Sequence, residues 1–491
     1  MKYIFAVVFS VLALLVQSQQ PNKLLESAFW QSKPDAEAVK AEVAKGANPA
    51  EMNGNSFDPT VMAINAGAPN EVVFYLLGQK GNEVGKVTHD SRNYIHWAAS
   101  KGNVELVKYL LEKGASTSNE DSHGMTPLNF AVGGGQQNLE VYDLLIGKGA
   151  DVKGDLNHDG ANALLLGIGN DPDFKLTEYF ISKGLDIHSK DAAGNTAFDY
   201  AARSGNIKVM NLLLTKGVKP TQNAMIMASQ GTRRGANGIH VFQYLDSLGV
   251  KTTASSATGE NVLHNTVRRP GQLELVSWFL SKGVNAGQAD NEGNTPFMNA
   301  AASGKDTAVL DLLLAKVKNI NQVNKKGLSA LAMAVRTNSL PVIRYLLSKG
   351  SDIKTTDADG NNLVYYVVQS YNARTAEEFD GKMSLLAEQG LSLTAPQKDG
   401  STLYHLAVAK NDLALLKKIE PLKADVNAKN KEGLTPLHKA AMTAKDDSIL
   451  KYLLSVGAKR DLTTTFSETA FDLSQENEFL SKKKISTDFL K

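Results

Sequence analysis

A nine-residue pattern recurs about every 33 to 35 residues along nearly the whole chain. Its fullest copy reads Gly-Leu-Thr-Pro-Leu-His-Lys-Ala-Ala at residues 433–441, and close copies occupy residues 124–131, 194–202 and 293–301. Each copy precedes a second apolar stretch that ends in glycine, such as residues 104–114. A fixed period of this length is typical of repeat architectures, in which each unit packs only on its neighbours. The 491 residues are therefore expected to form stacked units rather than several domains with separate cores.

Each copy of the pattern predicts two short helices. In residues 293–301, Thr295 is suited to cap the first helix through its hydroxyl, and Pro296 fits the first helical turn. The second stretch, as in residues 104–114, carries apolar residues at helical spacing and ends in a glycine suited to a left-handed C-terminal residue. The sequence therefore predicts repeated helix-turn-helix units linked by tight turns.

The period near 33 residues and the opening T-P-L-H-x-A resemble the ankyrin repeat over residues 22–475. The resemblance implies an all-α repeat solenoid with β-hairpin-like turns, of about twelve repeats with degenerate caps. We expect an N-terminal capping repeat at residues 19–53, the solenoid at residues 54–462, and a C-terminal cap and tail at residues 463–491. The lysine-rich tail at residues 481–486 is expected to fray.

The N-terminus has the pattern of a secretory signal peptide at residues 1–18. Lys2 precedes an apolar run that is short for a membrane span, and polar residues follow it from Gln17. We expect cleavage before Gln19, with an uncleaved anchor as the alternative, and a secreted or periplasmic protein, most consistent with a bacterium. The chain has no cysteine, so an exported protein of this size must rely on packing rather than on disulfides.

Composition and motifs give no indication of catalysis or of a cofactor. The formal net charge is +2, which favours no nucleic-acid partner. Residues 155–160 match the first half of a calcium-binding loop, but the twelfth position is Leu166 where a glutamate ligand is needed. The resemblance implies that four histidines in one slot of their repeats are structural hydrogen-bonding residues. These are His96, His264, His405 and His438. We expect no catalytic residue, no metal site and no cofactor.

The resemblance also implies where a partner would bind. Ankyrin proteins use the turn tips and the last residues of the first helix, which together line the concave face. At the helix ends of this chain basic residues recur and acidic residues do not, whereas the turn tips are mixed. The predicted partner-binding stripe consists of Lys101, Arg203, Arg268, Arg269, Arg336 and Lys410. A competing interpretation is that Lys and Arg at helix ends only complement the C-terminal end of the helix dipole.

These patterns together predict a monomeric, non-catalytic binding scaffold of the cell envelope or exterior, with an acidic segment of another protein as its partner. One alternative is a protective or envelope-stress factor for an exported enzyme. Another is a hydrolase with a site in the insertions at residues 231–238 or 370–380, which are expected to protrude as links between helices. Neither insertion contains histidine, and only the second contains carboxylates: Glu377, Glu378 and Asp380.

Overall fold

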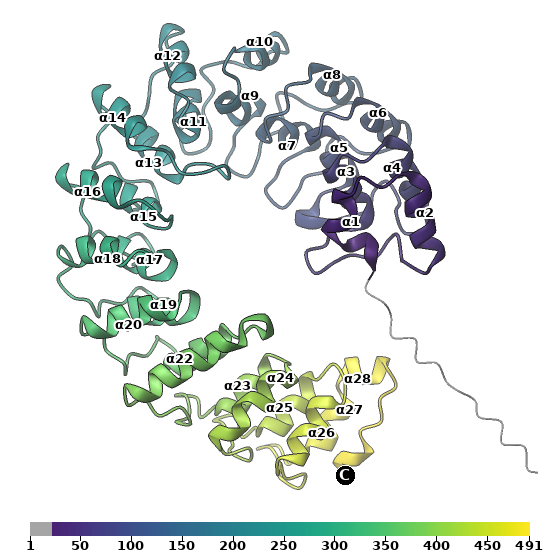
Figure 1. Cartoon of the computed structure of the whole chain (residues 1–491), viewed down its shortest axis with the longest axis vertical. Coiled ribbons are helices and arrows are strands. Elements are labelled where there is room, and N and C mark those ends of the chain that lie inside the picture. The colour runs from purple at the N-terminus through teal and green to yellow at the C-terminus, as the bar shows by residue number, and fades with distance from the viewer. Residues whose placement is uncertain (1–21) are drawn as a thin grey trace, which may run out of the picture. The chain divides into compact units, whose positions relative to one another are not determined.

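The computed structural model describes residues 22–491. The predicted signal peptide at residues 1–18 and the predicted mature start at Gln19 lie outside these residues. The described chain divides by its internal contacts into two compact units, which meet in sequence between Thr221 and Gln222. Within each unit, odd-numbered helices pack on one another in an inner row and even-numbered helices pack in an outer row (Figure 1).

The first unit contains six helix pairs, each an inner helix followed by an outer one. The pairs are α1 (Ser27–Gln31) with α2 (Ala36–Ala44), α3 (Pro59–Ala66) with α4 (Asn70–Leu77), α5 (Tyr94–Ser100) with α6 (Val104–Glu112), α7 (Pro127–Gly133) with α8 (Leu139–Gly147), α9 (Ala163–Gly167) with α10 (Lys175–Ser182), and α11 (Ala197–Ser204) with α12 (Ile207–Thr215). Three 3-10 turns accompany them: η1 (Lys23–Leu25), η2 (His89–Ser91) and η3 (Ile168–Asn170).

The second unit contains eight helix pairs. The pairs are α13 (Asn223–Gln230) with α14 (Ile239–Ser247), α15 (Val262–Thr266) with α16 (Leu273–Ser281), α17 (Pro296–Ser303) with α18 (Thr307–Leu314), α19 (Ala330–Thr337) with α20 (Leu340–Ser348), α21 (Leu363–Gln369) with α22 (Ala376–Glu388), α23 (Leu403–Ala409) with α24 (Leu413–Ile419), α25 (Pro436–Thr443) with α26 (Ser448–Ser455), and α27 (Ala470–Gln475) with α28 (Glu478–Lys482). Its 3-10 turns are η4 (Ala373–Thr375), η5 (Glu420–Leu422) and η6 (Asp488–Leu490). Fourteen pairs among the described residues agree with twelve repeats and two degenerate ends, and the predicted all-α repeat solenoid is confirmed.

The residues of the repeated motif cap and start each inner helix. At α25 the hydroxyl of Thr435 accepts a hydrogen bond from the amide of His438, and the imidazole of His438 accepts one from the amide of Thr435. Pro436 occupies the first helical turn, where its missing N–H costs no hydrogen bond. Ala440 and Ala441 are fully buried, so neighbouring inner helices approach closely. The motif that repeats in the sequence is therefore a helix-start motif.

Between each outer helix and the next inner helix, the chain forms a hairpin-like turn, here called a finger. In the finger before α17, a carboxylate oxygen of Asp290 accepts hydrogen bonds from the amides of Glu292 and Asn294, at 2.9 and 2.7 Å. Gly293 has φ +82°, and a Cβ there would lie 2.9 Å from the amide nitrogen of Lys325 in the next finger. That amide donates to the carbonyl oxygen of Glu292 at 2.9 Å. Adjacent fingers are thus joined backbone to backbone, which leaves no space for a side chain at this glycine.

The outer helices are linked by a recurring polar contact. The carboxylate of Asp143 in α8 accepts hydrogen bonds from the hydroxyl of Tyr179 in α10 and from the ammonium of Lys183, which caps that helix, at 2.8 and 2.9 Å. The same arrangement joins α18 to α20 through Asp311, Tyr345 and Lys349, with distances of 2.7 and 2.9 Å. These groups are exposed to solvent, which screens their charges, so each contact adds little to the stacking of its repeats.

A buried polar cluster holds the second and third repeats together. The carboxylate of Asp58 caps α3 at the amide of Val61 and also accepts from the hydroxyl of Tyr94, at 2.8 and 2.6 Å. The ammonium of Lys86 lies 2.7 Å from the same carboxylate and 2.9 Å from the side-chain oxygen of Asn82. The side chain of Asp58 is fully buried, and these partners replace the water that it loses on folding.

The insertion at residues 370–380 does not protrude as the predicted link. It forms η4 and the first turns of α22, which has 13 residues and is the longest helix among residues 22–491. Phe379 and Met383 are buried, so the added turns have an apolar side. Of the insertion's carboxylates, Glu378 pairs with Lys382 at 3.6 Å and Asp380 with Lys418 at 2.7 Å. The surplus residues therefore lengthen an outer helix.

The C-terminal tail is also more ordered than predicted. After α28 the chain turns back, and the hydroxyl of Thr487 accepts hydrogen bonds from the side chains of Ser474 and Gln475, both at 2.8 Å. Leu480 and Leu490 are 1% exposed. The expected fraying is wrong for this segment, because two buried leucines tie it to the last repeat and cover its otherwise open end.

Candidate functional site

The six residues of the predicted stripe have different surroundings, and the two units are considered separately. In the first unit, Lys101 is the C-cap of α5 and Arg203 lies in the last turn of α11, and both are exposed. In the second unit, Arg268 is exposed and pairs with Glu260 at 3.1 Å. Arg336 lies in the last turn of α19 and is exposed.

Arg269 and Lys410 are engaged with the backbone of the preceding repeat. The guanidinium of Arg269 donates to the carbonyl oxygens of Gln230, the last residue of α13, and of Thr232, both at 3.1 Å. The ammonium of Lys410 donates to the carbonyl oxygen of Gln369, the last residue of α21, at 3.1 Å. Both cations satisfy helix C-terminal carbonyls, as the dipole interpretation expects for helix ends.

The insertion at residues 231–238 is held by this contact. Residues Thr232 and Gly235 form a β-bridge, and the side-chain amide of Asn237 donates to the carbonyl oxygen of Ala228 at 2.9 Å. With Arg269 bound to the carbonyl oxygen of Thr232, the insertion is a short closed turn fixed to the end of α13. Arg269 therefore has a structural role in its own repeat pair.

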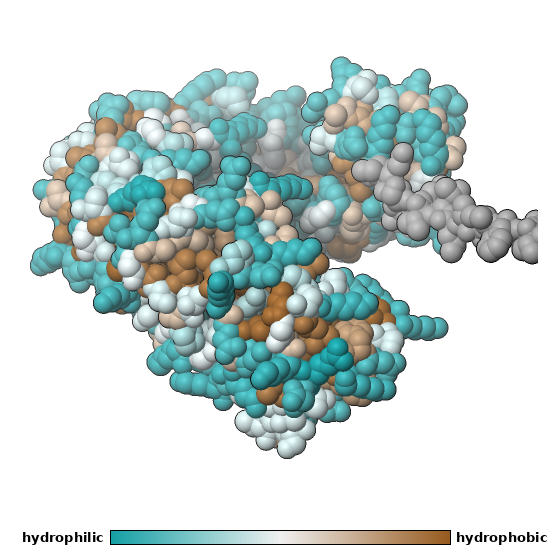
Figure 2. All heavy atoms as spheres, turned by 60° about the horizontal axis from the view of Figure 1, so that its bottom comes forward, coloured by the Kyte–Doolittle hydropathy of each residue, from teal (hydrophilic) through white to brown (hydrophobic). Residues whose placement is uncertain are grey.

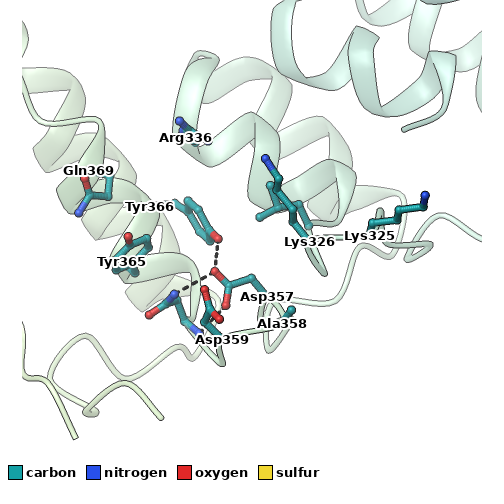
Figure 3. Close-up of a pocket in the computed structure, with 11 residues that line it drawn as sticks. Lys325, Lys326, Arg336, Asp357, Ala358, Asp359, Tyr365, Tyr366 and Gln369 are labelled. Carbon is teal, nitrogen blue, oxygen red and sulfur yellow. Dashed lines mark hydrogen bonds between the residues drawn. The ribbon is translucent and has the colours of Figure 1, made fainter. Parts of the chain in front are cut away.

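Arg336 borders a concavity with a volume of about 470 Å³ (Figure 3). Two fingers and the inner helices α19 and α21 form it. Its lining includes Lys325, Lys326, Leu328, Arg336, Asp357, Ala358, Asp359, Asn361, Tyr365, Tyr366 and Gln369. We call this concavity the α19–α21 pocket. Within residues 22–491, none of its three cations lies within ion-pair distance of a carboxylate.

The wall of the pocket is fixed by a tyrosine and an aspartate. The hydroxyl of Tyr366 donates to a carboxylate oxygen of Asp357, which also accepts from the side-chain amide of Asn361 at 2.9 Å. Burial alone would raise the pKa of Asp357, but the hydrogen bonds from Tyr366 and Asn361 outweigh it and lower that pKa. Burial, followed by the hydrogen bond and charge of Asp357, raises the pKa of Tyr366. Asp357 is therefore ionised and Tyr366 is neutral at physiological pH.

Tyr365, Tyr366, Gln369 and Asp357 were not among the residues predicted to bind. A signal for the Tyr366–Asp357 contact does exist, because the tyrosine follows the first aspartate of its finger by nine residues. Tyr200 follows Asp191 by the same interval, and its hydroxyl donates to that carboxylate at 3.0 Å. A tyrosine at this spacing indicates that its hydroxyl is bound to the finger.

The four slot histidines are structural, as predicted. In His96, His264, His405 and His438, Nδ1 accepts from the amide of the helix-capping residue at 3.0 to 3.2 Å. Nε2 faces a carbonyl oxygen of the next repeat at 2.9 to 3.2 Å, so Nε2 carries the proton. Burial lowers the pKa of all four imidazoles, that of His96 to about 4. Each of these histidines joins two repeats in its neutral form.

The partial calcium-binding sequence folds as a finger. The side-chain oxygen of Asn157 accepts hydrogen bonds from the amides of Asp159 and Ala161, at 3.1 and 2.8 Å, which is the turn chemistry of the other fingers. Among residues 22–491, no three histidines, aspartates or glutamates are arranged to hold a metal ion.

Apolar side chains also reach the surface of the second unit. Figure 2 shows hydrophilic residues over most of the visible face, with apolar residues in separate patches. Met442, at the end of α25, is 47% exposed, and Phe466, at a finger tip, is 82% exposed. Single exposed apolar residues are ordinary on protein surfaces, so the α19–α21 pocket remains the better-defined site.

Comparisons with known proteins agree with the repeat architecture. A family model of ankyrin repeats in three copies matches residues 60–154, 137–224 and 263–357, and a model of many copies matches residues 403–454. Within residues 22–491, no helix is long and apolar enough to cross a bilayer.

Three relatives illustrate how widely this architecture is used. Transient receptor potential cation channel subfamily A member 1 of Homo sapiens is 23% identical over 426 residues, which are 76% of this chain and 34% of that protein. The nuclear factor NF-kappa-B p105 subunit of Gallus gallus is 26% identical over 223 residues, 45% of this chain and 22% of that protein. An ankyrin repeat protein of Rickettsia felis is 26% identical over 275 residues, 56% of this chain and 59% of that protein. The chain spans less than two thirds of each of these relatives. With family matches over more than half of its residues and a stack of paired helices, the chain belongs to the ankyrin repeat family, an architecture of protein-interaction scaffolds.

Proposed function

We propose that this protein is an exported, non-catalytic scaffold that binds an acidic segment of another protein on the inner face of its second unit. The observation that supports this proposal is the α19–α21 pocket. Lys325, Lys326 and Arg336 border this one concavity, and no carboxylate of the described chain lies within ion-pair distance of them. Rigid helices and joined fingers hold the backbone that carries these groups, so binding orders side chains but not the backbone.

Electrostatics favours an acidic segment over a neutral one. Unpaired cations in a concave surface attract acidic ligands during encounter, and the attraction weakens as salt screens it. A guanidinium such as that of Arg336 can also hold a carboxylate through two parallel hydrogen bonds. The proposal does not use Arg269 and Lys410, because their charged groups already donate to backbone carbonyls.

A matched pair of double variants tests this function. Lys326→Glu with Arg336→Glu reverses the charge of the pocket, whereas Lys316→Glu with Lys318→Glu makes the same change in exposed residues between α18 and the next finger. The purified proteins are used to capture partners from a cell-envelope extract at two salt concentrations. We expect the pocket variant to capture at least about tenfold less partner than the natural protein does. Equal loss with both variants, or no loss with either, would contradict the proposed site.

The proposed export rests on the sequence of residues 1–18 alone and needs its own test. Those residues are fused to a reporter enzyme that lacks a signal, and reporter activity outside the cytoplasm is measured. Replacing the apolar run by alternating serines is the control. Reporter activity that stays inside the cell with both fusions would contradict export.

The same captured partner separates the scaffold from a protective factor. If the partner is an enzyme, its half-life at elevated temperature is measured with and without this protein. If the natural protein lengthens the half-life of the enzyme and the pocket variant does not, the protective role is favoured.

A further inference from the structure

We infer that the α19–α21 pocket recognises a pair of opposite charges: a carboxylate of the partner beside Lys326 and Arg336, and next to it a cationic side chain beside Asp359. This inference rests on the proposed function and specifies the sequence that the pocket selects. It treats the acidic residues of the pocket as part of the site.

The cationic side of the pocket is formed by one finger and the inner helix that follows it. Lys326 comes from the finger before α19, and Arg336 from the last turn of that helix. Figure 3 shows the Lys326 side chain extending to the side of the pocket where Arg336 and Tyr366 lie, while Lys325 points away from them. Lys326 and Arg336 are exposed and without a carboxylate partner in the described chain. These two groups are therefore the pair available to a ligand carboxylate.

The anionic side comes from the neighbouring finger. Asp359 is exposed at the tip of this finger. Asp357, in the same finger, accepts hydrogen bonds from Tyr366 and from both the amide and the side chain of Asn361. Asp357 is half-buried and its oxygens are already occupied, so Asp359 is the carboxylate that a ligand can contact. The two sides are joined by a backbone hydrogen bond from Ala358 to the carbonyl oxygen of Lys326, at 3.0 Å. This bond fixes the spacing between the cationic and anionic groups.

The α21 side of the pocket suits an extended peptide backbone. The ring of Tyr365 packs edge-on against Tyr366, with ring centres 5.2 Å apart, and Gln369 follows one turn later on α21. Gln369 has an amide that can both donate to and accept from a peptide group. The hydroxyl of Tyr366 is bound to Asp357, so this tyrosine contributes a ring face and no free donor.

This arrangement makes the pocket selective as well as attractive. A run of consecutive acidic residues would place a negative charge beside Asp359, and like charges at close range oppose binding. An acidic residue followed by a basic one places each charge beside its opposite. The pocket is therefore expected to prefer alternating charges to a uniformly acidic segment, although both carry a carboxylate for Arg336.

The test uses three fluorescein-labelled hexapeptides: alternating Glu-Lys, all Glu and all Lys. Their affinities for the full protein are measured by fluorescence anisotropy at one ionic strength, and Asp359→Lys is compared with the natural protein. We expect the natural protein to bind the alternating peptide about five- to tenfold tighter than the all-Glu peptide, and Asp359→Lys to reverse that order. Asp359→Asn should give an intermediate ratio. Circular dichroism checks that these exposed tip variants keep their helices.

Two results would overturn the inference. The first is an all-Glu peptide that binds the natural protein as tightly as the alternating one, with Asp359→Lys leaving the ratio unchanged. The second is no binding of any peptide. Failure of the proposed function is recognised separately, because the Lys326→Glu, Arg336→Glu variant would then still capture the natural partner in full.

Discussion

The ammonium of Lys410 donates a 3.1 Å hydrogen bond to the carbonyl oxygen of Gln369, the last residue of the inner helix one repeat earlier. Arg336 lies near the end of its own inner helix but borders the α19–α21 pocket. Two basic residues from one pattern in the sequence thus have different tasks. The first joins repeats, and the second is available to a partner.

Replacing these two residues should separate stability from binding. Lys410→Met removes one hydrogen bond to a carbonyl and should lower the free energy of unfolding by about 0.5 to 1.5 kcal/mol without changing peptide affinity. Arg336→Met should lower peptide affinity and leave stability within about 0.5 kcal/mol. Urea unfolding followed by circular dichroism, together with peptide anisotropy, measures both effects. Equal changes in both variants would show that the two side chains share one role.

Because of the four slot histidines, we expect the folded protein to lose stability as the pH is lowered. Each is held neutral in the fold, so its folded pKa lies below the value near 6.5 of an unfolded histidine. Between those two values the unfolded chain binds more protons, and stability falls as the pH is lowered. For His96, with a folded pKa of about 4, the loss between pH 7 and pH 5 is on the order of 2 kcal/mol. Stability should be unaffected by protonation of these groups above about pH 7.5.

Thermal melting from pH 8 to pH 5 measures this effect. His96→Gln should melt lower than the natural protein at pH 7.5, because its contacts are altered, but its melting temperature should fall less on acidification. A variant whose pH dependence matches that of the natural protein would show that His96 does not contribute to it.

The buried carboxylate of Asp58 should be far more important than an exposed one with similar partners. Asp58→Ala leaves the ammonium of Lys86 and the hydroxyl of Tyr94 without their acceptor and should cost about 3 to 5 kcal/mol. Asp311→Ala removes contacts to a tyrosine and a lysine on the exposed outer helices, where solvent screens the charges, and should lower the free energy of unfolding far less. Denaturant unfolding compares the two. Similar costs would contradict the assignment of Asp58 to a buried cluster.

Lys423 offers a stabilising substitution. It has φ +54°, in the left-handed region, at the place where most repeats have glycine, such as Gly457 with φ +99°. A side chain in that conformation is strained by about 1 to 2 kcal/mol, so Lys423→Gly should stabilise the protein by about 1 kcal/mol. Val317 stands at the equivalent place without a positive φ, so Val317→Gly should destabilise it. Melting temperatures of the two variants should move in opposite directions, and a decrease for Lys423→Gly would refute the strain.

The fold could be predicted from the sequence because the repeat period itself specifies it. Glycines, capping residues and paired alanines recur at fixed positions, and every copy supports the same assignment. The insertion at residues 370–380 differs from the predicted link because its extra length extends the helix α22. Glu377 and Glu378 in a first turn, with Phe379 and Met383 one turn apart, were the signal of an added helical turn.

The candidate site could be predicted only in part, because a position in the repeat does not show what a side chain reaches. Arg336 and Lys410 occupy neighbouring positions of the repeat pattern. The ammonium of Lys410 nevertheless donates to a carbonyl oxygen of the preceding inner helix, whereas Arg336 lines the α19–α21 pocket. The pocket also combines residues from two fingers and two helices, more than thirty positions apart. Its aspartate and tyrosine pair is visible in the sequence only as a nine-residue interval that recurs in one other repeat.

The histidine contacts between repeats have a consequence for the growing polypeptide. Each Nε2–H reaches a carbonyl oxygen that lies 24 to 30 residues further along the chain, the last of them that of Leu462. A repeat leaving the ribosome has its own two helices but lacks the acceptor that the following repeat supplies. Repeats with this histidine can therefore be completed only by later residues, and folding during synthesis should trail translation by about one repeat. A nascent chain arrested after the outer helix of such a repeat, but before the next finger, would therefore display an unsatisfied imidazole and an uncovered helix pair.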